Sequence, residues 1–291
     1  QRMKPDWLKT QIPGEGHYAE MLKLVKDNKL HTICESGKCP NIGECWGAGT
    51  ATFMIGGNTC TRSCQFCNVA TGAGEKLDPL EPFKVAQSIN IMGIKHAVIT
   101  SVDRDDLEDG GSIHWAKTVT TIREFNPETT LETLIPDFQG NTEQLDRIIS
   151  VHPEIVSHNI ETVRRLTKEV RVQAKYDRSL FVLSYLKEKG MKTKSGIMCG
   201  MGEAEDEILE TMSSRESESE TPLVLAYPVT SMPFLRRRER MLPPILPRPT
   251  SPICIGAAFL FCVWVGSFIS GLEDLVEEDT CSYRWILFPW S

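Results

Sequence analysis

The chain has 291 residues, a length that allows one large domain or two modest ones. Hydrophobic residues make up 41% and charged residues 24%, which excludes a wholly disordered chain. The 32 lysines and arginines are outnumbered by 39 aspartates and glutamates, giving a net charge of -7, so the chain lacks the basic character of a general nucleic-acid-binding protein and no nucleic-acid partner is expected.

Residues 1–50 predict an irregular, cysteine-bearing extension with one short helix at 18–28. Residues 1–9 contain neither an apolar signal core nor an Arg- and Ser-rich presequence, so we expect a cytoplasmic location. Six of the 10 cysteines lie between Cys34 and Cys67. In a reducing compartment such clustering favours metal ligands over disulfides.

From residue 51 to residue 212 the pattern predicts strands that alternate with helices. Strands are expected at 51–55, 96–100, 129–135, 154–157 and 192–198. Helices are expected at 82–92, 113–125, 142–151, 178–189 and 203–212, with a further helix beginning at 162. This spacing predicts a parallel sheet or a barrel with βα crossovers. The loops that follow the strands carry most of the polar residues, which is where such barrels place their chemistry.

Beyond residue 212 the composition changes. Residues 213–221 are rich in Ser and Glu, eight of the 17 prolines fall in 222–252, and 253–272 carries no charge and is long enough to cross a bilayer. Three interpretations of 213–291 stay open. The segment could follow a shifted reading frame, replace a domain with a membrane anchor at 253–272, or complete the barrel with a sixth strand at 223–229. Proline-rich flanks argue against the anchor, so no membrane partner is expected.

Two sets of three cysteines are the strongest chemical signal. Cys60, Cys64 and Cys67 fall within eight residues, so their thiolates can face one point. Three ligands rather than four indicate a metal centre with an open position, such as an iron–sulfur cube with one iron free for a small molecule. A zinc site completed by a distant residue is the alternative.

The second set is Cys34, Cys39 and Cys45. Taken alone, it fits a zinc-binding loop as well as an iron–sulfur cluster. Because both sets are short of a fourth ligand and lie close together in the sequence, a protein with two clusters is the better interpretation.

Six segments together resemble the lipoyl synthase family of radical S-adenosylmethionine enzymes. They are CESGKCPNIGECW, GNTCTRSCQFCNVATG, TSVDRDDLEDGG, IPDFQG, SHNIETV and KSGIMCGMGE. The resemblance runs from about residue 4 to residue 212. It implies an α/β fold, a partial TIM-like (β/α)6 barrel of the radical S-adenosylmethionine type. The extension would span 1–50, the barrel core 51–212 and a divergent tail 213–291.

The resemblance also implies two [4Fe-4S] clusters. Cys60, Cys64 and Cys67 would hold the cluster that S-adenosylmethionine chelates, and the second set would hold an auxiliary cluster that is consumed as the sulfur source. The implied reaction inserts sulfur at C6 and C8 of a protein-bound octanoyl chain. Implied partners are an octanoylated lipoyl carrier domain, either the glycine cleavage H protein or a 2-oxoacid dehydrogenase E2, and reduced ferredoxin or flavodoxin as electron donor.

Polar residues at the predicted strand ends are candidate ligands of S-adenosylmethionine. They are Ser101, Asp103, Asn159, Glu161, Arg178 and Ser195. Each has a plainer alternative: a solvated salt-bridge loop for the Asp/Arg set after the second strand, a helix cap for Asn159 and Glu161, a structural ion pair for Arg178, and a tight turn for the glycine-flanked segment that holds Ser195.

The tail departs from the family. Family members end in an Arg-Ser-Ser-Tyr motif whose serine ligates the auxiliary cluster. The nearest match here, Ser282-Tyr283, is preceded by Cys281 and not by Arg. Two alternatives to lipoyl synthase activity therefore stay open: another radical S-adenosylmethionine enzyme with an auxiliary cluster, or an inactive cluster-binding remnant.

Overall fold

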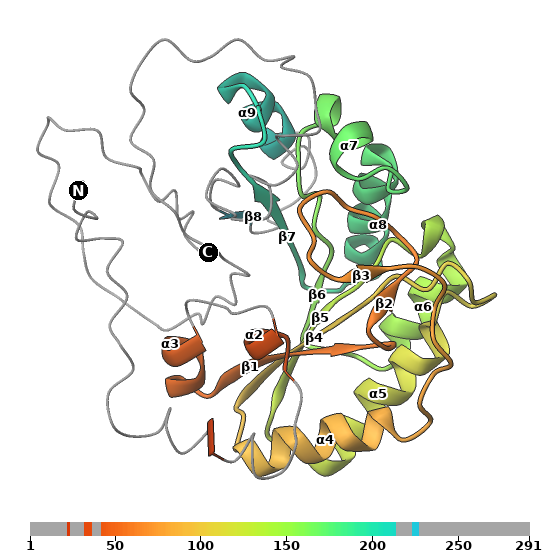
Figure 1. Ribbon diagram of the computed structural model, residues 1–291, viewed down its shortest axis with the longest axis vertical. Coiled ribbons are helices and arrows are strands. Elements are labelled where there is room, and N and C mark those ends of the chain that lie inside the picture. Colours follow the sequence, from red (N-terminus) through yellow and green to blue (C-terminus); the bar gives the residue numbers. More distant parts are fainter. Residues whose placement is uncertain (1–21, 24–31, 37–41, 214–222, 227–291) are drawn as a thin grey trace, which may run out of the picture.

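The computed structural model describes residues 22–23, 32–36, 42–213 and 223–226 (Figure 1). Of the helix expected at 18–28, only Leu22 and Lys23 fall within this part, and both are helical. The uncharged segment 253–272 and Ser282-Tyr283 lie outside the described residues. Within them, no helix has the length and apolar character needed to cross a membrane.

A six-stranded parallel sheet forms the centre of the molecule. Its order is β1-β4-β5-β6-β7-β8, which follows the chain. The strands are β1 Thr50–Ile55, β4 His96–Ser101, β5 Thr130–Leu134, β6 Ile155–Ser157, β7 Thr193–Met198 and β8 Leu223–Ala226. Neighbouring strands that are consecutive in sequence and joined by helices define the partial (β/α)6 barrel, so the predicted fold class is confirmed.

One helix follows each strand of the barrel from β1 to β7, except that two helices follow β6. The helices are α4 Glu81–Met92, α5 Ser112–Phe125, α6 Thr142–Ser150, α7 Arg164–Val170, α8 Tyr176–Glu188 and α9 Glu205–Ser213. Both α7 and α8 lie between β6 and β7, where the sequence also predicted two helices. The short helices α2 Ile33–Ser36 and α3 Ile42–Gly47 carry Cys34 and Cys45 and pack against β1.

The sixth strand bears on the three interpretations of the tail. An absent sixth strand would have left the edge of β7 unpaired. Instead, β8 pairs with β7 in parallel from Ser195↔Leu223 to Met198↔Ala226. This agrees with the interpretation in which the segment after 212 completes the barrel, and it extends the sheet beyond the predicted core boundary at 212.

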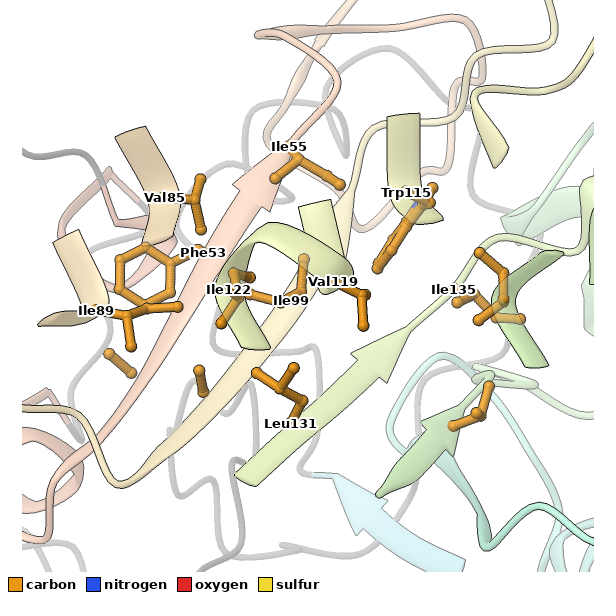
Figure 2. Packing of buried hydrophobic residues seen from close by; sticks show 14 of the residues in the cluster. Phe53, Ile55, Val85, Ile89, Ile99, Trp115, Val119, Ile122, Leu131 and Ile135 are labelled. Atoms are coloured by element: carbon orange, nitrogen blue, oxygen red, sulfur yellow. The ribbon is translucent and has the colours of Figure 1, made fainter. Parts of the chain in front are cut away.

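The apolar core lies between the sheet and the helices. Figure 2 shows Phe53, Ile99 and Leu131 of the strands packed against side chains of α4 and α5 such as Ile89 and Ile122, and all five are at most 1% exposed. Because side chains alternate along a strand, the neighbours of these residues face the inner side of the sheet. The inner side and the carboxyl-terminal edge of the sheet are therefore where polar chemistry can be placed.

Two small elements shape that carboxyl-terminal edge. Gly56 and Gly57 have φ of 88° and 97°, a left-handed conformation that turns the chain out of β1. It then enters a two-stranded parallel sheet of β2 Thr59–Cys60 and β3 Ala70–Thr71. The turn η2 Phe138–Gly140 follows β5. The cysteine loop between β2 and β3 is thus carried above the strand ends.

Candidate active site

The loop from Cys60 to Cys67 is fixed by backbone hydrogen bonds at several points. Gly72 N donates to Cys60 O at 3.0 Å, Cys67 N donates to Cys64 O at 3.1 Å, and Gln65 N donates to Val170 O at 2.9 Å. The last bond ties the loop to the end of α7. The three cysteines therefore project from a loop whose path is held by both β3 and α7.

The environment of the thiols disfavours their ionised form. Cys60 and Cys64 are half-buried, and Cys67 is exposed. Burial, together with the carboxylate of Asp103, raises the pKa of Cys60 to about 11. Burial likewise raises the pKa of Cys64 to about 12, and Arg171 only partly offsets it. Thiolates at this place need a strong cationic partner, which the irons of a cluster supply.

The donor set fits an iron–sulfur cluster. The three cysteines lie on one loop of eight residues, and the charge on Cys67 contributes to the raised pKa of both Cys60 and Cys64. Within the described part of the chain, no three His, Cys, Asp or Glu side chains converge as ligands of a single ion would. In a four-iron cluster each thiolate binds its own iron.

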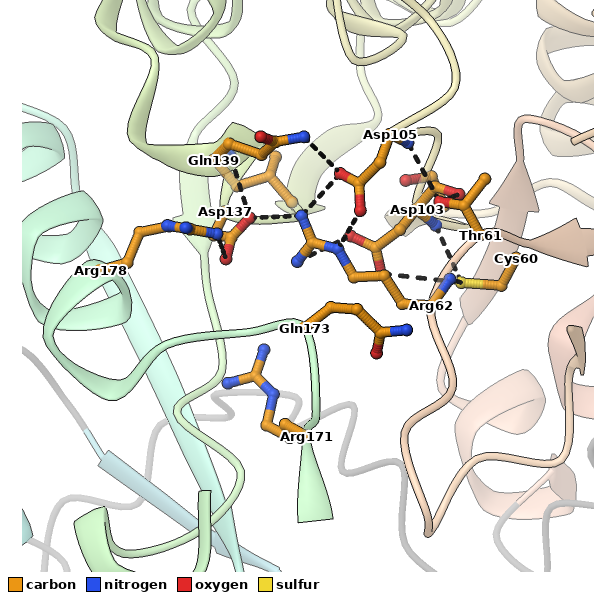
Figure 3. Close-up of polar contacts among 12 residues, drawn as sticks. Cys60, Thr61, Arg62, Asp103, Asp105, Asp137, Gln139, Arg171, Gln173 and Arg178 are labelled. Carbon is orange, nitrogen blue, oxygen red and sulfur yellow. Dashed lines mark hydrogen bonds and ion pairs between the residues drawn. The ribbon is translucent and has the colours of Figure 1, made fainter. Parts of the chain in front are cut away.

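A buried ion network surrounds Arg62, which lies between Cys60 and Cys64 (Figure 3). Its Nε and Nη2 donate to both carboxylate oxygens of Asp105 at 2.6 and 2.8 Å, and Nη2 also donates to Asp137 Oδ1 at 2.7 Å. Nη1 lies 3.3 Å from Asp103 Oδ1. The network thus joins the cysteine loop to the loops that follow β4 and β5.

Glu161 and Arg171 provide opposite charges that both act on the pKa of Cys64. Glu161 has φ 68°, an uncommon conformation for a non-glycine residue, and its backbone bridges to β7 through Gly196 O at 3.0 Å and Met198 N at 2.8 Å. Burial raises the pKa of its carboxyl, while Arg171 and a hydrogen bond with Asn159 act in the opposite direction. A strained backbone conformation at a residue with a buried carboxylate is typical of a ligand site.

Arg171 retains unused hydrogen-bonding capacity. Its Nη1 donates to Asn159 O at 3.1 Å and Ile160 O at 2.9 Å, but its buried Nε has no partner among the described residues. S-adenosylmethionine carries an amino group and a carboxylate at one end. Glu161 and Arg171 match those two groups in charge, and the Nε of Arg171 is a buried donor without a partner among the described residues, so the residues present fit this cofactor.

The remaining predicted site residues are placed as follows. Asp103 lies beside Cys60, with Oδ2 3.7 Å from Sγ. Ser101 Oγ accepts a hydrogen bond from Trp115 Nε1 at 3.1 Å, which places it on the helix side of the sheet. Ser195 is 1% exposed and lies on the opposite side of β7 from Lys194. Arg178 Nη1 lies 3.2 Å from Asp137 Oδ2.

The second cysteine set is only partly described. Cys34 is buried, its Sγ is 4.0 Å from Thr52 O, and burial raises the pKa of its thiol. Cys45 is half-buried, and Cys39 lies outside the described residues. Because α2 and α3 both pack against β1, Cys34 and Cys45 lie on the β1 side of the barrel.

Comparison with known proteins agrees with this geometry. Residues 54–214 match the model of the radical SAM superfamily, so the chain is a radical S-adenosylmethionine protein. It is 61% identical to the lipoyl synthase of Flavobacterium psychrophilum over 242 residues, covering 82% of this chain and 83% of that protein. It is 66% identical to the mitochondrial lipoyl synthase of Nematostella vectensis over 210 residues, covering 72% of each. The chain belongs to the lipoyl synthase family.

Solved structures support the fold alone. The FeFe-hydrogenase maturase HydG from Carboxydothermus hydrogenoformans matches with a TM-score of 0.51 at 13% identity, covering 72% of this chain and 56% of that one. Methylornithine synthase matches with a TM-score of 0.50 at 12% identity, covering 72% of this chain and 64% of that one. The chain spans less than two thirds of each of these structures.

Three site residues escaped the sequence analysis: Arg62, Asp137 and Arg171. Arg62 falls between two ligand cysteines and looks like a spacer in the sequence. Asp137 stands in the segment IPDFQG, and Arg171 follows a helix with no motif around it. The sequence offered only a weak signal for Asp137 and Arg171, namely that they follow a predicted strand or helix.

Proposed function

We propose that this chain catalyses the insertion of two sulfur atoms at C6 and C8 of a protein-bound octanoyl chain, which gives the lipoyl cofactor. The observation that carries the proposal is the cysteine loop above the strand ends, flanked by Glu161 and Arg171, in a chain that is 61% identical to a lipoyl synthase over 82% of its length. The lipoyl synthase family belongs to the sulfurtransferases, which fits this chemistry.

A radical cofactor is required because acid–base groups cannot open an unactivated C–H bond; a [4Fe-4S] cluster with S-adenosylmethionine supplies that chemistry when bound. Cys60, Cys64 and Cys67 would hold the cluster. Arg171 would bind the carboxylate of S-adenosylmethionine and Glu161 its amino group, with Asn159 hydrogen-bonded to Glu161 to orient it. Both charges act on the pKa of Cys64, so these two residues would hold the cofactor near the cluster, whose fourth iron would have no thiolate from this set.

A second [4Fe-4S] cluster, held by Cys34, Cys39 and Cys45, is the proposed sulfur source. Cys34 and Cys45 are carried by α2 and α3 on the β1 side. These two residues, with Cys39, would hold the auxiliary cluster, which would supply the sulfur atoms when bound. The fourth protein ligand would come from outside the described residues.

The proposed protein partner is an octanoylated lipoyl carrier domain, either the glycine cleavage H protein or a 2-oxoacid dehydrogenase E2. The proposed electron donor is reduced ferredoxin or flavodoxin, in the cytoplasm. Support for both comes from the lipoyl synthase relatives, since the substrate of that reaction is carried by a protein and each turnover needs electrons.

Metal analysis tests the two-cluster proposal. Protein reconstituted without oxygen should bind about eight irons, as two four-iron clusters. Replacing Cys60, Cys64 and Cys67 together with Ala should leave about half, and the matched replacement of Cys34, Cys39 and Cys45 should leave the other half. Zinc in place of iron, or iron that neither triple substitution changes, would contradict the proposal.

Product analysis tests the reaction. Dithionite-reduced protein should form 5′-deoxyadenosine from S-adenosylmethionine and should convert an octanoylated carrier domain to the lipoylated one. Cys34→Ala should retain the first activity and lose the second. Cofactor cleavage without any change in the carrier would instead favour another radical S-adenosylmethionine enzyme, and loss of both activities in the unsubstituted chain would favour an inactive remnant.

A further inference from the structure

We propose that Arg62 is a positioning residue that locks the cysteine loop onto the strand-end loops, and that its forked guanidinium, more than its charge, keeps the cluster in place. The inference rests on the proposal that Cys60, Cys64 and Cys67 hold an iron–sulfur cluster. Arg62 binds no substrate and no iron in this scheme. It acts through Cys60 and Cys64, between which it lies.

The first support is the number and burial of its contacts. The Arg62 side chain is 3% exposed and forms ion pairs with Asp103, Asp105 and Asp137, at 3.3, 2.6 and 2.7 Å. Exposed ion pairs contribute little to stability, but this guanidinium is buried and is shared by three carboxylates. Its partners come from two loops, and they lie between 41 and 75 positions further along the chain.

The second support is a direct connection to the ligand sulfur. The backbone N of Arg62 lies 3.4 Å from Cys60 Sγ, and Asp103 N donates to the same sulfur at 3.3 Å. Thr61 N donates to Asp103 O at 3.0 Å, and Asp105 N donates to Thr61 Oγ1 at 3.0 Å. Residues 60–62 are thus joined to residues 103–105 by hydrogen bonds of backbone amides. The Arg62 guanidinium joins the same two segments through ion pairs with Asp103 and Asp105 (Figure 3).

The third support is electrostatic. Asp103 lies 3.7 Å from the thiol of Cys60, which must be anionic to bind iron, and Asp105 and Asp137 add two more carboxylates to the same network. Among the described residues, only Arg62 contacts all three aspartates. Arg178 offsets part of this charge from the far side of Asp137. A lysine at position 62 would supply one point charge, but it could not donate to both oxygens of Asp105 and still reach Asp137. Geometry and charge can therefore be separated by substitution.

The experiment compares Arg62→Lys, Arg62→Met and the matched control Arg104→Lys. The Arg104 side chain is 4% exposed, and it too donates two hydrogen bonds to one aspartate, Asp106, both at 2.8 Å. Its third contact is Gly56 O and not the cysteine loop. All three variants are made in Cys34→Ala protein, so that only the cluster of the Cys60 set is measured. The readouts are iron per folded chain, the rate of iron loss to a chelator, and the electron paramagnetic resonance spectrum of the reduced cluster with and without S-adenosylmethionine.

We expect Arg62→Lys to lose iron about 10- to 100-fold faster than the parent, as residues that orient metal ligands do when changed. Its spectrum should also differ from that of the parent when S-adenosylmethionine is added. Arg62→Met should lose iron at least as fast, and Arg104→Lys should match the parent in rate and spectrum. If Arg62→Met fails to fold, Asp105→Asn removes half of the fork with one atom changed and should give an intermediate rate.

Three outcomes would overturn the inference. Arg62→Lys could match the parent, in which case charge alone is enough. Arg104→Lys could lose iron as fast as Arg62→Lys, in which case the effect is general loosening of the barrel edge. Asp105→Asn could leave the rate unchanged. Failure of the proposed cluster site, on which the inference rests, is distinguishable from all of these, because the unsubstituted Cys60 set would then bind no iron at all.

Discussion

The two faces of the six-stranded sheet are built from opposite kinds of residue. On β5, Leu131 faces the helices and is fully buried among apolar side chains, while the next residue, Glu132, faces inward and is 4% exposed. Both residues are buried, but different interactions stabilise them there. Leu131 needs only close packing, whereas the carboxylate of Glu132 needs specific partners.

Those partners come from three other strands. Lys194 Nζ of β7 donates to both oxygens of Glu132 at 2.7 and 2.9 Å, Ser157 Oγ of β6 donates at 2.7 Å, and His96 Nε2 of β4 lies 3.6 Å away. Although burial opposes ionisation, the hydrogen bonds from His96 and Lys194 lower the pKa of Glu132 to about 2. The helix side thus stabilises the barrel through the apolar area that it buries. The inner side depends on a few hydrogen bonds and ion pairs, each of which a single substitution can remove.

The largest expected effect breaks the inner side. Lys194→Met leaves the Glu132 carboxylate buried without its cation and should lower the free energy of unfolding by about 3–5 kcal/mol, measured by urea denaturation. The double variant Lys194→Met with Glu132→Leu replaces the pair with apolar groups and should recover most of that loss. A double variant as unstable as the single one would show that the inner face does not depend on pairing.

The helix side should respond to loss of volume instead. Leu131→Ala leaves a cavity between β5 and the helices and should cost about 2–5 kcal/mol of unfolding free energy, measured in the same way. Iron per folded chain should stay at the parent value, because Leu131 faces away from the cysteine loop. Reduced iron in protein that is still folded would mean that the two faces are coupled.

The same division explains what the sequence could predict. Hydrophobic periodicity placed the strands and helices of the barrel within a few residues, since the helix-facing positions of β1, β4 and β5 are continuous apolar patterns. The short elements α2, α3, β2 and β3 were not predicted. The sixth strand, predicted as one option at 223–229, is present at Leu223–Ala226. The cysteine spacing pointed to a cluster, which the lipoyl synthase relatives support.

The contacts of the site could not be predicted in the same way. Arg62, Asp105 and Asp137 meet only because β4 and β5 are neighbours in register, so their sequence separations carry no signal. The hydrogen bond of Ser101 with Trp115 follows from its position in the alternation of β4, and its role at the cofactor stays a prediction. The left-handed conformation of Glu161 depends on its bridge to Ile197, which no local rule predicts.

The next effect is pH-dependent and arises where β6 ends. His158 is 1% exposed; its Nδ1 donates to Ile135 O at 2.9 Å, so the neutral ring accepts at Nε2 from Ser179 Oγ, also at 2.9 Å. Burial and the nearby Arg171 lower the pKa of His158 from 6.5 to about 4. Below pH 6.5 the unfolded chain therefore binds one more proton than the folded chain, and stability is lost as the pH falls towards 4.

From about pH 6.5 to about pH 5 this residue should remove about 2 kcal/mol of unfolding free energy, at about 1.4 kcal/mol per pH unit. His158→Gln should be less stable at neutral pH, because its hydrogen bonds change, but its stability should fall with a slope smaller by about 1.4 kcal/mol per pH unit in this range. Urea denaturation at several pH values measures both slopes, and equal slopes would show that His158 is not the group responsible.

The smallest effect concerns a polar residue near the site that serves the helix side. Asn141 follows η2 and caps α6: its Oδ1 accepts from Glu143 N at 2.9 Å and Gln144 N at 3.3 Å, while Leu145 and Ile148 of the same helix are fully buried. Asn141→Ala leaves these two amides without an acceptor and should cost about 1 kcal/mol of unfolding free energy. Asn141→Asp keeps the acceptor and adds a negative charge at the helix start, so it should retain parent stability or exceed it. Neither substitution should change iron per folded chain, and an Asp variant as unstable as the Ala variant would show that Asn141 stabilises the loop and not the helix.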